Sequence, residues 1–432
     1  MKPNLCLAAC LLMWGIAHAA WADSSSEDVS ALRQQVQQLI EVVQQLKGTL
    51  QAQQQHIADL ERASAAQIPP VAGTTQASPP TSLPGRQSLG GLNLSAFNPE
   101  IGVVADMTGQ LSESSADGEG NDKLSVREIE LVFGHPIDPY SRFDSTITFS
   151  DFESPGVEEA YITHWGLPGE IKAKLGRMRP KIGKASALHT DSLDTVDEPL
   201  VVSKYLGKEG LFRTGLELTG FLPTPWTAVI HELTVGTMEG GVGEDGTLFG
   251  SAKRRPSFYT HLKNFWDISD TSNLELGTTY LLGSKDADAA YEVNALGLDA
   301  TFIQYLTPTN RLKFQNEVYL QSRKESFSID ENGKQTNFEK HPWGLYSLLD
   351  YRLSPRLGIG GRVDYVRPID LNLVASPRNA DTAWSSYLTF YQSEFSRWRL
   401  QLRHTDFAAG GDDNTIFAQG TIAIGVHKHQ LQ

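Results

Sequence analysis

Four acidic residues lie close together in residues 180–210, a long polar segment between two predicted strands. They are Asp191, Asp194, Asp197 and Glu198, and they share the segment with Lys181, Lys184, Lys204 and Lys208. Carboxylates that face basic side chains across a narrow space create a transverse electric field, which orients small charged or dipolar molecules and excludes apolar ones. The plainer alternative is that each charge is solvated and paired with a neighbour. Which of these two arrangements the charges adopt depends on the strands that position the segment.

Short matches to nucleotide-binding and catalytic motifs lack the structural context that those motifs need. Residues 241–246 have the sequence GVGEDG, but no helix is expected to follow them and bind phosphate. Gly183-Lys184 lacks the serine or threonine of a phosphate-binding loop. Serine, histidine and aspartate are all present, but the sharp turn that carries a hydrolase nucleophile is not. We therefore expect no enzyme and no cofactor.

The sequence also predicts no metal site. Residues 117–122 and 412–414 are acidic, and His427-Lys428-His429 lies near the C-terminus. Solvated surface turns explain the two acidic stretches more simply than calcium binding. A frayed terminus explains the histidines.

Residues 1–22 are predicted to be a secretory signal peptide. They combine a positive start, an apolar run too short to span a membrane and Ala20-Trp21-Ala22, so cleavage is placed before Asp23. Both cysteines, Cys6 and Cys10, lie in this segment, and the mature chain therefore has neither a disulfide nor a thiolate ligand. The formal charge of the whole chain is −14. Removal of the peptide takes away one lysine and makes the charge more negative, which argues against a nucleic-acid partner.

Residues 23–62 carry a seven-residue pattern typical of a coiled coil. Core positions recur alternately three and four residues apart, at Val29, Leu32, Val36, Leu39, Val43, Leu46, Leu50, Gln53, Ile57 and Leu60. A helix packed on a globular core has a wider apolar stripe, and a helix lying on a membrane is basic and aromatic. Valine and leucine in the core favour two strands, whereas Gln53 also suits a three-fold axis. Residues 63–92, rich in proline, serine and alanine, are a predicted linker.

From residue 93 to residue 432 the sequence consists of short segments in which polar and apolar residues alternate. This pattern predicts an all-β transmembrane barrel. The sixteen candidate strands are about 99–111, 124–135, 141–152, 157–166, 169–179, 211–221, 226–238, 256–267, 272–283, 291–306, 310–325, 343–353, 356–366, 382–394, 397–408 and 415–427. Connections after even-numbered strands are short and rich in turn formers, and those after odd-numbered strands are mostly long. An antiparallel up-and-down barrel has such short turns on one side and long loops on the other. The predicted fold is a 16-stranded barrel preceded by an α-helical coiled coil.

Polar and apolar residues alternate within the predicted strands. Arg142 and Asp144, for example, alternate with Phe143. Charges on the polar face require an aqueous interior, while the apolar face contacts lipid. The basic residues predicted to line the interior wall are Arg142, Lys172, Lys174, Arg213, Lys263, Lys313, Arg362, Arg399 and Arg403. The acidic ones are Glu128, Glu130, Asp144, Glu159, Glu217, Asp299, Glu317 and Asp364.

Two stretches of the predicted barrel resemble a known family. The first is Lys174-Leu175-Gly176-Arg177, followed by a long loop and Phe212-Arg213-Thr214-Gly215-Leu216. The second runs from Trp343-Gly344-Leu345-Tyr346 through Arg362-Val363-Asp364-Tyr365. They resemble Gram-negative outer-membrane porins, in particular the phosphate-selective porin O and P family. A coiled coil before the barrel is similar to sugar and dicarboxylate porins.

The resemblance implies an outer-membrane channel for passive diffusion of small polar or charged solutes. Its third exterior loop, residues 180–210, would fold inward and narrow the lumen with its four acids. The implied partners are outer-membrane lipid, the solutes, further copies of the chain in a homotrimer and, for a periplasmic coiled coil, peptidoglycan. A structural anchor and a barrel hydrolase are the alternatives. The solute stays open among dicarboxylates, phosphate, sugars and short peptides.

The purified mature protein is expected to need detergent for solubility and to give a circular-dichroism spectrum dominated by β-structure, because alternate side chains from about residue 99 onward face lipid. Solubility without detergent, or a mostly helical spectrum, would contradict the barrel.

Overall fold

The structure is a computed structural model that describes residues 99–113, 123–151, 154–208, 210–225, 228–240, 248–249, 255–285, 291–329, 335–369 and 376–425. All of them belong to one compact unit, Gly91–Gln432. The predicted signal peptide, coiled coil and linker lie outside the described residues, as do all ten predicted coiled-coil core positions from Val29 to Leu60. Within the described ranges, no helix has the length and apolar character to cross a membrane.

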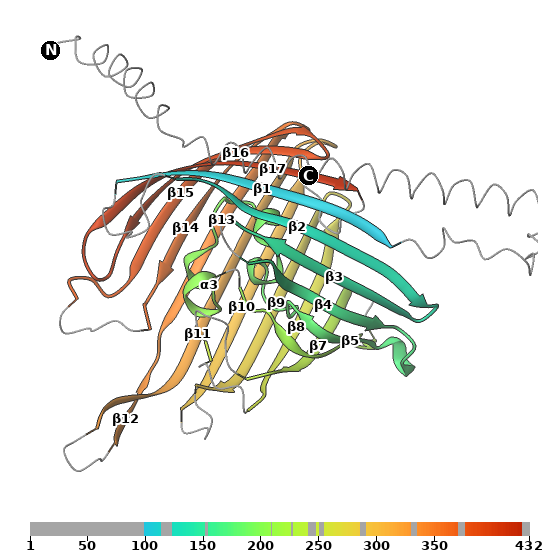
Figure 1. The fold of residues 1–432 in the computed structure, drawn as a ribbon, viewed down its shortest axis with the longest axis horizontal. Helices are drawn as coiled ribbons and strands as arrows, with labels where there is room; N and C mark the ends of the chain where they lie inside the picture. The colour runs from blue at the N-terminus through green and yellow to red at the C-terminus, as the bar shows by residue number, and fades with distance from the viewer. Residues whose placement is uncertain are drawn as a thin grey trace, which may run out of the picture. The chain divides into compact units, whose positions relative to one another are not determined.

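The described chain forms a closed antiparallel sheet (Figure 1). Its strands are β1 (Glu100–Ser112), β2 (Lys123–Asp138), β3 (Ser141–Phe149), β4 (Gly156–His164), β5 (Lys172–Met178), β6 (Arg213–Phe221), β7 (Val229–Met238), β8 (Ser257–Ser269), β9 (Ser272–Ser284), β10 (Glu292–Tyr305), β11 (Arg311–Ile329), β12 (Gln335–Lys340), β13 (Trp343–Ser354), β14 (Leu357–Val366), β15 (Asp381–Ser393), β16 (Ser396–Asp406) and β17 (Asp412–Gly425). β1 pairs with both β2 and β17, which closes the barrel. β12 and β13 both pair with β11, so β12 extends one hairpin and the wall itself has sixteen strands.

The predicted 16-stranded up-and-down barrel is confirmed, with differences at a few strands. The strand predicted at 169–179 is the shorter β5, because a 3-10 turn, η2 (Pro168–Glu170), precedes it. β12 lies in a segment predicted to be loop. Its sequence, QTNFEK, shows no apolar alternation, and backbone pairing with β11 forms it instead.

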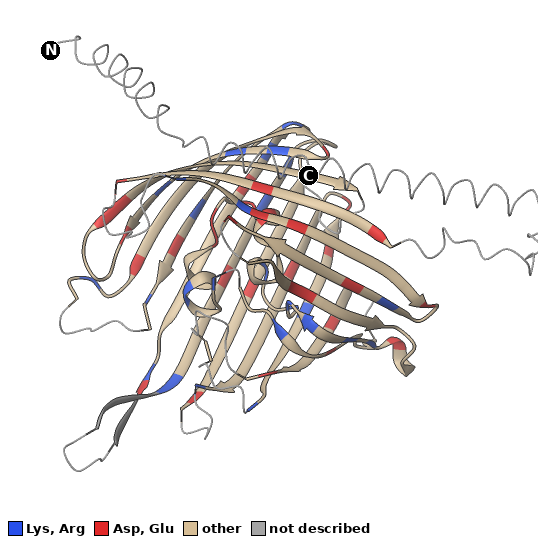
Figure 2. Cartoon of the chain, in the orientation of Figure 1, with Lys and Arg blue, Asp and Glu red and all other residues tan. Residues whose placement is uncertain are grey.

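The inner and outer faces of the wall differ in polarity. On β16, Arg397 and Arg399 are buried on the inner face, whereas Trp398 and Leu400 are about half exposed on the outer face. Figure 2 shows acidic segments on β1–β4 and basic segments on β16. The period-two alternation of a strand therefore places charge inside the barrel and apolar surface outside it.

Large side chains and glycines fit together across neighbouring strands of the inner face. Three tyrosines each lie against the glycine that is directly opposite on the neighbouring strand. The pairs are Tyr259 with Gly236, Tyr319 with Gly297 and Tyr387 with Gly360. Each hydroxyl donates a hydrogen bond to a buried carboxylate: Tyr259 to Glu217 at 2.9 Å, Tyr319 to Glu317 at 3.1 Å and Tyr387 to Asp350 at 3.1 Å. The missing glycine side chains therefore make room for the rings that hold the inner acids.

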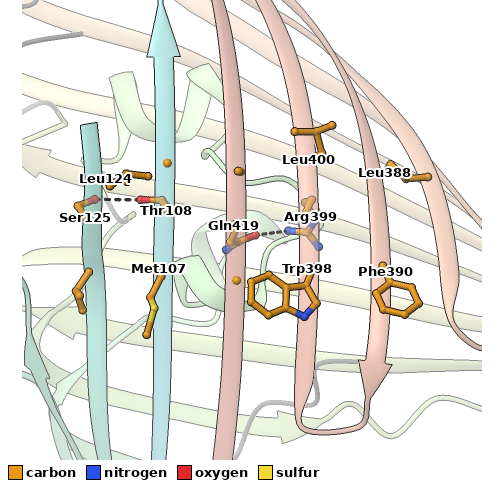
Figure 3. A pocket seen from close by; sticks show the side chains of 14 residues that line it. Met107, Thr108, Leu124, Ser125, Leu388, Phe390, Trp398, Arg399, Leu400 and Gln419 are labelled. Atoms are coloured by element: carbon orange, nitrogen blue, oxygen red, sulfur yellow. Dashed lines mark hydrogen bonds between the residues drawn. The ribbon is translucent and has the colours of Figure 1, made fainter. Parts of the chain in front are cut away.

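The outer face carries a shallow apolar groove of about 620 Å³ across β1, β2 and β15–β17. Met107, Leu124, Phe390 and Trp398 border it (Figure 3). The hollow forms at Gly109, Ala418 and Gly420, because glycine has no side chain and that of alanine is only a methyl group. The lining is almost wholly apolar, as expected of the outward side of this wall.

Replacing Gly360 with alanine is expected to lower the free energy of unfolding by about 1–3 kcal/mol, a typical cost of overpacking. The new Cβ would meet the Tyr387 ring and would lie 2.7 Å from the Leu349 carbonyl oxygen. Urea unfolding of the detergent-folded barrel measures the change.

Gly358→Ala is the matched control, because Gly358 lies on the same face of β14 and its nearest contacts are 3.8 Å away. Equal destabilisation by the two substitutions would show that the tyrosine–glycine fit is unimportant.

Candidate functional site

The connection between β5 and β6, residues 179–212, lies against the inner face of the barrel and is called loop 3 below. It contains two 3-10 turns, η3 (Ala185–Ala187) and η4 (Thr190–Ser192), and one short helix, α3 (Leu200–Tyr205). Its residues form hydrogen bonds or ion pairs with residues of β2, β4, β6, β9, β11, β14, β15 and β16. Contacts to strands all around a closed wall place loop 3 across the interior (Figure 1).

An apolar cluster packs loop 3 against the wall. Val201, Val202 and Tyr205 of α3 are buried in it, together with wall tyrosines 346 and 387. Asp364 accepts a hydrogen bond at 2.9 Å from the backbone N–H of Leu200, which satisfies one of the free donors at the start of α3. At its other end, the Tyr205 hydroxyl donates to the Arg367 carbonyl oxygen at 2.6 Å.

The first half of loop 3 is basic and binds acidic residues of the wall. The ion pairs are Arg179 with Glu158, Lys184 with Glu275 and Asp299, and His189 with Glu130, Glu158 and Glu159. The backbone assists, since the N–H groups of Arg179, Lys181 and Ala185 donate to Glu159, Glu217 and Glu317.

His189 is the most enclosed base of this half. Its Nδ1 lies 3.1 Å from Glu130 and its Nε2 lies 3.3 Å from Glu159. Burial and the nearby Arg179 guanidinium act to lower the pKa of His189, but the surrounding carboxylates outweigh them and raise that pKa well above its usual value.

The middle of loop 3, residues 191–198, is acidic and binds basic residues of the wall, whereas Lys204 further along pairs with Asp381 of β15 at 3.0 Å. Asp194 lies 2.7 Å from the Lys313 ammonium group. Asp197 lies 2.9 Å from Arg362 and 2.8 Å from Arg403. Burial acts to raise the pKa of both aspartates, but these cations outweigh burial and hold each pKa below its usual value.

Three wall arginines also hold the backbone of this acidic stretch. Arg397 donates to the Asp191 carbonyl oxygen, Arg399 to that of Leu193 at 2.9 Å, and Arg127 to that of Val196 at 2.5 Å. In return, the Val196 N–H donates to Gln401 at 2.7 Å. Side chains from the wall thus fix both the charges and the backbone path of residues 191–197.

Six of the nine predicted basic wall residues contact loop 3 or an acid of the wall. Lys313, Arg362, Arg399 and Arg403 bind loop 3 directly. Among the others, Arg142 pairs with Glu100 and Asp144, and Lys263 pairs with Glu232. Lys172 and Lys174 alternate with the exposed Leu175 on β5, and Arg213 is buried.

The four predicted loop acids have different surroundings. Asp194 and Asp197 touch the wall at ion-pair distance, because the long lysine and arginine side chains reach the loop. Asp191 lies beside Glu130 and His189, and Glu198 offers its carbonyl oxygen to Arg362 at 3.2 Å.

Sequence reasoning missed several residues of this network. Arg397 could have been found, because it stands two residues before Arg399 on the same predicted strand. Arg179 and His189 gave no such signal, since the loop backbone that orients them has no repeating pattern. Gln401 was missed because it is uncharged.

Comparisons with known proteins agree with this fold. No protein-family model matches the chain. An uncharacterized protein of Aquifex aeolicus (strain VF5) is 28% identical over 338 residues, which cover 72% of this chain and 71% of that protein. The anion-selective porin from Comamonas acidovorans superimposes with a TM-score of 0.52 at 10% identity, covering 76% of this chain and 99% of that chain. Salmonella typhi OmpF, in a complex with daunomycin, gives 0.51 at 9% identity over 76% and 97%. Pseudomonas putida OprB gives 0.50 at 12% identity over 78% and 97%. The described unit therefore has the fold of outer-membrane porins.

Asp197→Asn is expected to weaken docking of the acidic stretch by about 1–3 kcal/mol, the usual cost of leaving buried polar partners unsatisfied. Arg362 and Arg403 lose the carboxylate they share, although Arg362 keeps Asp364 at 2.7 Å. Hydrogen–deuterium exchange of residues 193–200 at pH 7 measures the loss of protection. Unchanged protection would contradict the anchoring role of Asp197.

Acid is expected to act on the wild-type protein through the same carboxylate. Because the pKa of Asp197 is lower in the folded protein than in an unfolded chain, its contribution to docking is complete above about pH 4 and is lost only as the pH falls through the folded value. Protection of residues 193–200, corrected for intrinsic exchange, should stay constant from pH 7 to about pH 5. In stronger acid, protonation of Asp197 should lower the protection of the wild-type protein. The Asp197→Asn variant should lack this part of the decrease, because it has no carboxylate to protonate.

Proposed function

We propose that this chain is an outer-membrane porin through which small polar or charged solutes diffuse passively. The observation that supports it is a closed sixteen-stranded wall whose inner face carries charges and whose outer face is apolar. Such a wall is stable in lipid because every strand is paired and apolar side chains face the hydrocarbon. An interior lined with ionic groups favours water and hydrophilic solutes over apolar ones.

Loop 3 narrows the passage in this proposal, and its ion pairs decide where its charged residues lie. The pairs of Asp194 and Asp197 neutralise part of the basic wall. Arg397 and Arg399 add further positive charge to this side of the wall, and they donate hydrogen bonds to hydroxyl, amide and carbonyl oxygens. The charge on loop 3 therefore tunes the ion selectivity of the passage.

We propose the following organisation for the rest of the chain. Residues 1–22 direct export, residues 23–62 form a coiled coil in the periplasm that joins three copies, and residues 63–92 link it to the barrel in the outer membrane. The regular core from Val29 to Leu60 supports this arrangement. A two-stranded coiled coil is the alternative, and peptidoglycan and a phosphate-type solute are further proposals that rest on the resemblance alone.

Single-channel recording in planar bilayers tests the proposal. The wild-type mature protein is expected to give stepwise conductance in potassium chloride. Asp197→Asn is expected to shift the reversal potential under a salt gradient toward anions, because Arg362 and Arg403 lose a neutralising charge. Arg403→Gln is expected to shift it the opposite way.

Glu292→Gln provides the control for these recordings. Glu292 is half exposed and pairs only with Lys324 among the described ion pairs, and its loss should leave the selectivity unchanged. A folded wild-type protein that gives no conductance would favour the structural anchor over the channel. Conductance without any change in selectivity in Asp197→Asn would refute the role of loop 3.

A further inference from the structure

Loop 3 brings one histidine and one aspartate against an acidic part of the wall. His189 directly precedes η4 and Asp191 lies within it, and the two meet Glu130 on β2 and Glu158 on β4. One ligand atom from each of Glu130, His189 and Asp191 lies within 4.8 Å of the other two, and the same holds for Glu128, Glu130 and Glu158. Glu130 belongs to both groups and is the centre of the cluster.

The cluster gathers several buried carboxyl groups in a small volume. Five carboxyl groups meet there, those of Glu128, Glu130, Glu158, Glu159 and Asp191. Arg179 and His189 form ion pairs with three of them, Glu130, Glu158 and Glu159.

Two buried carboxylate oxygens of this cluster have no hydrogen-bond partner among the residues that the structure describes. They are Oε2 of Glu130, a residue only 1% exposed, and Oε2 of Glu158, a residue 4% exposed. A buried polar atom without a partner costs about 1–3 kcal/mol, and more when it is charged. Such atoms in a native protein indicate a bound water or ion, and carboxylate oxygens together with an imidazole nitrogen favour a cation.

We propose that this cluster binds a divalent transition-metal ion of the Zn²⁺ type, held by Glu130, His189 and Asp191 with Glu158 as a fourth donor. Imidazole nitrogen with carboxylate oxygen is a donor set that Zn²⁺ accepts, whereas Ca²⁺ takes six to eight oxygens. The 3.1 Å between Glu130 Oε1 and His189 Nδ1 is close to the separation of about 3.4 Å between two ligands on a tetrahedral zinc ion. The ion joins η4 of loop 3 to β2 and β4. The site is independent of whether the barrel conducts.

Isothermal titration of Zn²⁺ into the chelator-treated mature protein in detergent tests the site. All variants carry His427→Ala and His429→Ala, so that the C-terminal histidines supply no ligand. One ion per chain is expected. Glu130→Gln and Asp191→Asn should each weaken its binding by more than about tenfold, since even outer partners of metal ligands contribute 10–100-fold.

Glu292→Gln is the matched carboxylate control and should bind Zn²⁺ like the parent. Heat-modifiable gel mobility and circular dichroism confirm that each variant is folded. Visible absorption of Co²⁺ bound to the parent protein gives a second measurement, and it needs no substitution in the cluster. The intensity of this absorption reports tetrahedral coordination of the ion by nitrogen and oxygen.

Several outcomes would overturn the proposal. They are the absence of stoichiometric Zn²⁺ binding by the parent, undiminished binding by both Glu130→Gln and Asp191→Asn, and stoichiometric Ca²⁺ binding without Zn²⁺ binding. Loss of binding in both folded variants, with retention in Glu292→Gln, supports it.

Discussion

Closure of the sheet is the constraint from which the other features of the described unit follow. β1 pairs with β17 over a continuous register from Gly102 with Gly425 to Ser112 with Thr415. A closed wall satisfies the backbone of every strand without an edge, and it gives each side chain only two environments, inside or outside. Because the outside is apolar, the inner face has to carry the charged residues. The problem that remains is how those charges are stabilised inside a confined space.

Loop 3 provides this stabilisation through the order of its own charges. Its basic residues come first along the chain, from Arg179 to His189, and bind the acidic wall, while Asp194 and Asp197 follow and bind the basic wall. Shifting the loop along its path would oppose like charges and leave buried ions without partners. Breaking a buried pair in this way costs about 3–5 kcal/mol. The sequence of charges therefore selects one path across the barrel.

The wall could be predicted from the sequence, whereas the loop network could not. Period-two alternation on strands such as β16 fixes which residues share a face, and it groups Arg399 with Arg403. Alternation of short and long connections identified the topology. The partners of loop 3 are different in kind, since Asp197 and Arg362 are 165 residues apart and join only after the barrel has closed. An irregular backbone such as that around His189 has no period from which a side-chain direction can be derived. The inward position of the loop was therefore inferred from a resemblance, and its ion pairs had to be observed.

Apolar contacts and ion pairs have separate effects on loop 3, and their magnitudes show how. Full burial of a valine or leucine side chain contributes about 1.5–3 kcal/mol, and Val201, Val202 and Leu206 are almost completely buried. A buried ion pair gives much less net stability, because the desolvation of two charges offsets most of their attraction. The apolar cluster around α3 therefore supplies most of the free energy that keeps the loop inside. The ion pairs decide where each part of it lies, since a misplaced charge is far more costly than a correct pair is favourable. This division explains why a segment with so many charges can pack inside a closed barrel and still adopt one arrangement.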